Sequence, residues 1–177
     1  MIMVLVFLSA TPTVCATVIA HNFNESSDRH FVGNTSCTFT PSSGTSYTYT
    51  CGGSAEFGQA PNTNDPIRAK LNHSNDFIYI TSPIENLSEV MINFTSSITP
   101  LTGFTNIKVY ISDDGVNWGD PLPEARMDYT INSRVKAYIP KGNRYIKILN
   151  TNGSKPAYIS SITYTQSDCN CFKYIPE

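Results

Sequence analysis

Charged side chains are scarce in this sequence. Asp, Glu, Lys and Arg make up 15% of the 177 residues, and 12 basic residues stand against 14 acidic ones, for a net charge of -2. A protein that binds nucleic acid or an anionic membrane through its charge needs a basic excess, which is missing here. The low charge also argues against a coiled coil and a charged disordered tail. We therefore expect no nucleic-acid partner.

Long hydrophobic runs are missing as well, so the sequence predicts no transmembrane segment, which needs about 20 apolar residues. The continuous apolar run Met1–Leu8 is shorter than that, and the small residues Val14-Cys15-Ala16 follow it. This pattern is typical of a secretory signal peptide cleaved after Ala16. We expect residues 1–16 to be removed and the protein to be secreted or held at the cell surface. A lipoprotein anchored at Cys15 and a buried N-terminal strand are the alternatives.

Sequons for N-glycosylation agree with an extracellular location without proving it. They begin at Asn24, Asn34, Asn72, Asn86, Asn93 and Asn152.

Sustained helical periodicity is also absent. Short alternating runs rich in Thr, Tyr, Ile and Val recur instead, separated by turn residues such as Asp113-Asp114-Gly115 and Pro140-Lys141-Gly142-Asn143. Examples of these runs are 106–112, 135–139, 145–149 and 157–165. Many short strands at such spacing predict an all-β protein, a two-sheet antiparallel β-sandwich or jelly roll, over residues 17–166. Residues 167–177 read as a C-terminal tail.

Cysteine spacing predicts a disulfide in the first half of the mature chain. Strand-like sequence lies on both sides of Pro41-Ser42-Ser43-Gly44. A hairpin centred on Gly44 places Cys37 opposite Cys51, and an exported protein permits a disulfide between them. Its Phe and Tyr side chains then share one face, which we expect to be buried, and its Thr side chains share the other. The closely spaced Cys169 and Cys171 leave their pairing open.

The segment Lys108-Val-Tyr-Ile-Ser-Asp-Asp-Gly-Val-Asn-Trp118 reads as a strand followed by Ser-x-Asp-Gly-x-x-Trp. Further on come Arg144-Tyr-Ile-Lys-Ile and Ala157-Tyr-Ile-Ser-Ser-Ile. This order resembles the galactose-binding-like β-sandwiches, including the discoidin (coagulation factor type C) group, over residues 106–165. The resemblance implies a sandwich fold, and structural calcium is common in that family. Otherwise we expect no cofactor, and the loop with Asp113, Asp114, Asn117 and Asp120 does not fit an EF-hand.

The same turn supplies the first candidate binding residues. Asp114-Gly115 is a tight-turn pair in which glycine takes a positive φ. Trp118 then either covers the end of the sheet or offers its ring to the apolar face of a sugar. We select Trp118, with Asp114 and Asn117, as the first candidate ligand site, and Tyr47 and Tyr49 as the second.

Catalytic constellations are not evident. The three histidines, His21, His30 and His73, accompany no Gly-x-Ser-x-Gly motif, and spacing alone pairs no carboxylates for glycosidase chemistry. We therefore predict a non-catalytic module that binds a glycan or an extracellular protein. The alternatives are a small secreted lyase or glycosidase, which a cleft holding His73 or two carboxylates would favour, and a structural or adhesion domain.

Overall fold

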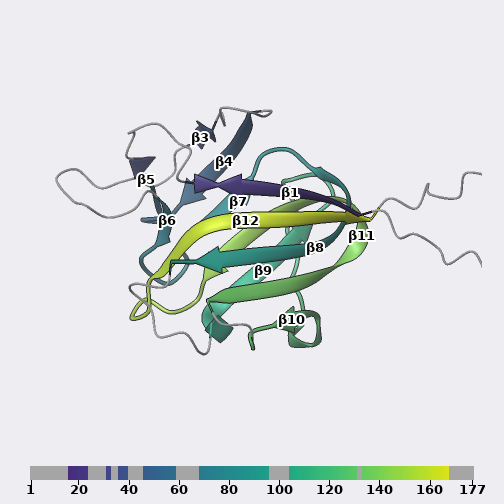
Figure 1. The fold of residues 1–177 in the computed structure, drawn as a ribbon. Coiled ribbons are helices and arrows are strands. Elements are labelled where there is room, and N and C mark those ends of the chain that lie inside the picture. Colours follow the sequence, from purple (N-terminus) through teal and green to yellow (C-terminus); the bar gives the residue numbers. More distant parts are fainter. Residues whose placement is uncertain are drawn as a thin grey trace, which may run out of the picture.

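A computed structural model describes residues 16–23, 31–32, 36–39, 46–58, 68–95, 104–130 and 133–167. Within them the chain is built of strands, with short 3-10 turns such as η2 (Phe104–Asn106) and η3 (Glu124–Arg126) (Figure 1). The all-β prediction is confirmed. The strands are β1 (Ala16–Asn22), β2 (Phe31–Val32), β3 (Ser36–Phe39), β4 (Tyr47–Gly52), β5 (Glu56–Gly58), β6 (Arg68–Leu71), β7 (Phe77–Ile80), β8 (Ile84–Phe94), β9 (Ile107–Ser112), β10 (Met127–Asp128), β11 (Arg134–Asn150) and β12 (Ala157–Ser167).

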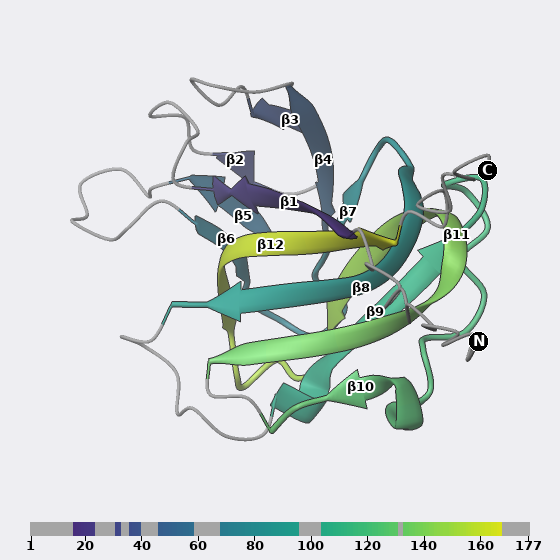
Figure 2. The same cartoon turned by 45° about the vertical axis from the view of Figure 1, so that its right-hand side comes forward.

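The strands form two antiparallel layers. In one layer β12 pairs with β8 on one side and with β1 and β6 on the other, and β8 pairs with the first part of β11. In the other layer the order is β3, β4, β7, β11 and β9. Figure 2 shows β1, β12 and β8 side by side in the first layer. The alternating apolar side chains of both layers face one another and form the core.

Strand β11 corrects one sequence prediction. The runs 135–139 and 145–149 were expected as separate strands around a turn at 140–143, but they belong to one strand. Its pairing with β8 shifts between Tyr138 and Gly142 and again between Gly142 and Arg144. The Pro, Gly and Asn residues therefore interrupt the ladder as bulges instead of reversing the chain, and bulges bend a strand. The bent β11 leaves one layer and enters the other.

The hairpin of β3 and β4 corrects a second sequence prediction, the register of its two strands. Cys37 pairs with Tyr49, not with Cys51, so the predicted register is wrong by two positions on the partner strand. A slip of two residues preserves the faces, because side chains alternate with a period of two. Tyr47, Tyr49 and Cys51 are accordingly buried, as expected. The Cys37 side chain lies outside the described residues, so the disulfide stays a prediction; peptide mapping of unreduced protein would detect it as a linked pair.

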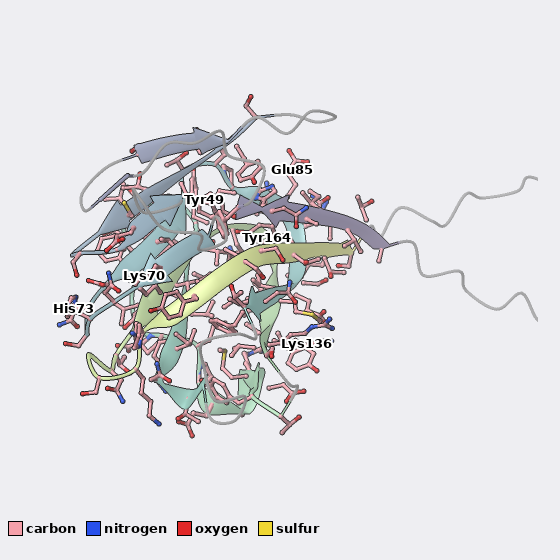
Figure 3. All side chains as sticks on the ribbon, turned by 60° about the vertical axis from the view of Figure 1, so that its left-hand side comes forward. Tyr49, Lys70, His73, Glu85, Lys136 and Tyr164 are labelled. Atoms are coloured by element: carbon pink, nitrogen blue, oxygen red, sulfur yellow. The ribbon has the colours of Figure 1, made fainter. Side chains whose placement is uncertain are left out.

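A buried chain of polar rings ties the layers together. His21 on β1 lies with its Nδ1 2.9 Å from the Tyr49 hydroxyl on β4, and that hydroxyl is 2.5 Å from the Tyr164 hydroxyl on β12. The His21 ring also stacks on Tyr47 at 3.8 Å between centroids. Figure 3 shows Tyr49 and Tyr164 side by side in the interior. Burial lowers the pKa of His21 to about 4 and raises the pKa values of Tyr49 and Tyr164, so these three rings stay neutral near pH 7.

Low pH is expected to destabilise the folded protein, because His21 is buried in its neutral form. The folded protein holds His21 neutral down to about pH 4, whereas an unfolded histidine takes up its proton near 6.5, so the unfolded state binds more protons between these values. The free energy of unfolding should therefore fall by on the order of 2 kcal/mol as the pH drops from 6.5 to 4. Urea unfolding across this pH range measures the free energy of unfolding. In the His21→Gln variant this free energy should depend much less on pH. An equally steep fall in that variant would contradict the assignment.

Candidate functional site

A row of large polar and aromatic side chains crosses the outward face of the second layer. Lys147 on β11 pairs with Tyr79 on β7 and with Tyr110 on β9, so the three lie in one line across the sheet. Their neighbours along the strands, including Ile78, Val109, Ile146 and Ile148, are buried in the core. The alternation of the strands therefore directs Tyr79, Lys147 and Tyr110 outward, and each is partly exposed.

A second row lies beside the first. Leu149 on β11 pairs with Phe77 on β7 and with Lys108 on β9. The Phe77 ring lies over Gly52 of the neighbouring strand β4, where an added Cβ would collide with the ring. Gly52 thus leaves the space that lets an aromatic ring lie against the backbone of the sheet.

The turn after β9 brings a further ring to this face. The Asp114 carboxylate accepts hydrogen bonds from the backbone N–H groups of Val116 and Asn117, each at 2.8 Å, and from the Ser112 hydroxyl at 2.8 Å. The side-chain amide of Asn117 donates a hydrogen bond to the other carboxylate oxygen of Asp114 at 2.7 Å. These bonds, above all that from the Asn117 backbone, lower the pKa of Asp114. Gly115 takes the expected positive φ, 74°.

Trp118 leaves this turn and lies beside the first row. The centroid of the Trp118 ring is 5.4 Å from that of Tyr79, with the ring planes at 61°. The Lys147 Nζ lies 4.8 Å from the centroid of the Trp118 ring. Lys147 also lies 4.7 Å from the Tyr110 ring and 5.8 Å from the Phe77 ring. We call this set, Phe77, Tyr79, Tyr110, Trp118 and Lys147, the aromatic–lysine face.

The electrostatics of Lys147 are unusual. Among the described residues, no carboxylate lies within ion-pair distance of its ammonium, which instead faces the rings of the aromatic–lysine face. Partial burial lowers its pKa, because desolvation disfavours the charged form. The rings offset part of this cost by cation–π attraction.

The predicted site residues are thus divided among different roles. Trp118 lies on the solvent side of a sheet. Asp114 and Asn117 build the turn that positions it, with the carboxylate occupied by hydrogen bonds inside the turn. Tyr47 and Tyr49 are 8% and 1% exposed, and their rings contact His21 in the core. These two candidate ligand residues therefore lie in the core and not on the surface, because the face of the hairpin that carries them is the inward one.

Sequence reasoning missed Phe77, Tyr79, Tyr110 and Lys147. Alternation within β9 and β11 does place Tyr110 and Lys147 on polar faces. It cannot show that β9 and β7 flank β11, which is what collects these residues around Trp118.

Ser54, His73 and Asp76 form a separate polar cluster at the edge of the sandwich, where Figure 3 labels His73. The buried Asp76 carboxylate accepts hydrogen bonds from the backbone N–H groups of Ser54 and His73, both at 2.8 Å, and from the Ser54 hydroxyl at 3.0 Å. The His73 Nδ1 lies 2.6 Å from the Ser54 Oγ but 3.9 Å from Asp76. In a Ser-His-Asp triad the imidazole bridges the other two groups. Here the Ser54 hydroxyl lies between His73 and Asp76 instead. The cluster therefore links the turn that carries Ser54 to the turn that carries His73 and Asp76.

Other chemistry is not assembled in the described part of the chain. No group of three His, Cys, Asp or Glu side chains there is placed to hold a metal ion. Of the loop acids, Asp113 pairs with Arg144 and Asp114 is occupied in its turn. Residues 16–23, 31–32, 36–39, 46–58, 68–95, 104–130 and 133–167 also contain no helix with the length and apolar character needed to cross a membrane.

Comparison with known proteins adds little. No family model matches the chain, and no curated protein is similar to it. Among solved structures, the chain is similar to one described as the His 62 mutant of the lectin binding domain of Lectinolysin complexed with Lewis b. The identity is 13% and the TM-score 0.43, over 56% of this chain and 71% of that one. Membership of the discoidin group stays a prediction.

The position of Trp118 should depend on Asp114. Asp114→Ala removes the acceptor for two backbone N–H groups, so the turn should reorganise and Trp118 should become more exposed. Trp118 is the one tryptophan of the sequence, so its emission should move to longer wavelength. Asp128→Ala is a matched control, because Asp128 accepts hydrogen bonds from Thr130 in a turn beside the other layer. Unchanged emission in Asp114→Ala would show that the turn does not need this carboxylate.

Proposed function

We propose that this protein is a secreted, non-catalytic module that binds carbohydrate on its aromatic–lysine face. The observation that carries the proposal is the row Tyr79–Lys147–Tyr110 with Trp118 beside it, all partly exposed on the outward side of a sheet. Sugars have apolar C–H faces that stack on aromatic rings and hydroxyl groups that exchange hydrogen bonds. The rings of the aromatic–lysine face can stack on the apolar face of a sugar. Its tyrosine hydroxyls and the Lys147 ammonium can form hydrogen bonds with the sugar hydroxyls.

Rigid placement favours binding over mere shielding of the sheet. Tyr79, Tyr110 and Lys147 lie on three neighbouring paired strands, and the hydrogen-bonded turn at Asp114 holds the base of Trp118. Side chains that are held in place before a ligand arrives lose little conformational entropy on binding. Tyrosine and tryptophan also have few rotatable bonds, which adds to this advantage.

The signal-peptide pattern at residues 1–16 supports a location outside the cell, where glycans are accessible. The geometry of Ser54, His73 and Asp76 gives the enzyme alternative no general base held by an acid, so a binding role fits the described residues better.

Removing rings from the face should weaken binding. We expect the mature protein to be retarded in gels that contain at least one polysaccharide of a panel of neutral and acidic polymers. Trp118→Ala and Tyr110→Ala should each weaken that binding about tenfold or more, which corresponds to about 1.4 kcal/mol. Tyr138→Ala is the control, because Tyr138 is an exposed tyrosine on the part of β11 that pairs with β8 in the other layer.

Two results would contradict the proposal. One is the absence of retardation with every polymer in the panel. The other is retardation that Trp118→Ala and Tyr110→Ala leave unchanged, which would move the binding surface elsewhere. Circular dichroism and the thermal midpoint of each variant would show that the fold is intact.

A further inference from the structure

Three acidic side chains around the aromatic–lysine face are already engaged. Asp113 pairs with Arg144, Asp114 is bound within its turn, and Glu124 lies 3.5 Å from the Nζ of Lys108. Lys136, in the other layer, likewise has Glu89 at 3.3 Å. Lys147 has no such partner among the described residues.

An ammonium in this position has unused capacity for hydrogen bonds. A lysine ammonium carries three N–H donors, and the faces of aromatic rings satisfy its charge only in part. Partial burial removes some of its water, which is the reason its pKa is lowered. An anionic group placed at the Nζ would restore a charge-assisted hydrogen bond where the local dielectric constant is below that of water.

The rows around Lys147 are free of negative charge. Its cross-strand neighbours are Tyr79 and Tyr110, and the adjoining row consists of Phe77, Leu149 and Lys108. Beyond Tyr79 the pairing continues to Thr50, whose hydroxyl lies 2.8 Å from that of Ser36. An acidic ligand lying along the row of Thr50, Tyr79, Lys147 and Tyr110 would therefore meet rings, hydroxyls and a cation. The carboxylate of Glu124 lies beside Lys108, at the end of the adjoining row.

We propose that the ligand of this face is an acidic glycan, and that Lys147 binds the carboxylate of one of its sugar residues. The inference rests on the function proposed above and names the class of its ligand. The pyranose ring of that residue stacks on Trp118 or Tyr110, and its carboxylate reaches the ammonium held between them. Lys147 lies at nearly equal distances from these two rings, 4.8 and 4.7 Å, so a sugar bound at either ring lies close to the Nζ.

Matched pairs of sugars test the inference. Oligogalacturonate, oligoalginate and sialyllactose would each be titrated against the mature protein beside their carboxyl-reduced forms, with Trp118 emission and calorimetry as readouts. We expect at least one acidic sugar to bind about tenfold or more tightly than its reduced form. Added salt should weaken the acidic complex and leave the neutral one nearly unchanged.

Variants locate the effect at one side chain. Lys147→Met should abolish the preference for the acidic form while weak binding of both forms remains, and Lys147→Arg should retain it. Lys70→Met is the control, because Lys70 also lies over one aromatic ring, that of Tyr158, but in the other layer. Unchanged thermal midpoints would show that each variant is folded.

The possible failures are distinguishable. Equal binding of acidic and reduced sugars, with loss of both in Trp118→Ala, would overturn the inference and leave the carbohydrate function standing. A preference for acidic sugars that Lys70→Met reduces as much as Lys147→Met would also overturn it, because the attraction would then be diffuse. Binding of neither form of any sugar in this set or in the polysaccharide panel would overturn the proposed function itself.

Discussion

The passage of one strand through both layers is the constraint on which this structure depends. The first part of β11 pairs with β8, and its last part lies between β7 and β9. Because its backbone hydrogen bonds are shared between the layers, neither layer is complete without it. The bulges around Gly142 make this passage possible by bending the strand. The same strand then carries Lys147 into the middle of the outward face, where a ring lies on each side of it.

The two faces of the second layer differ in how far their tyrosines are buried. Inward, Tyr49 is 1% exposed and its hydroxyl is satisfied by His21 and Tyr164, so its ring contributes packing and a bond between layers. Outward, Tyr79 and Tyr110 keep part of their surface in water beside the Lys147 ammonium, which pairs with no carboxylate of the described residues.

The turn from Ser112 to Trp118 shows how a loop acquires the rigidity of the sheet. Asp114 is exposed, yet its two oxygens accept bonds from Ser112, Val116 and Asn117. Gly115 packs against the ring of Tyr145 in the neighbouring strand, which anchors the turn to β11. Trp118 is consequently fixed relative to Lys147 by local hydrogen bonds on one side and by cross-strand pairing on the other.

Local alternation was enough to predict an all-β fold, the buried face of the β3–β4 hairpin and the tight turn at Gly115, because each depends on neighbours in sequence. Register and strand order were not predictable in the same way. Cys37 pairs with Tyr49 instead of Cys51, and β11 continues through residues that normally reverse a chain. Both outcomes differ from the prediction because distant strands decide which backbone groups are paired. The aromatic–lysine face belongs to this second class: its rings come from β7, β9 and the turn after β9, and only the tertiary placement of β11 between those strands brings them around one lysine.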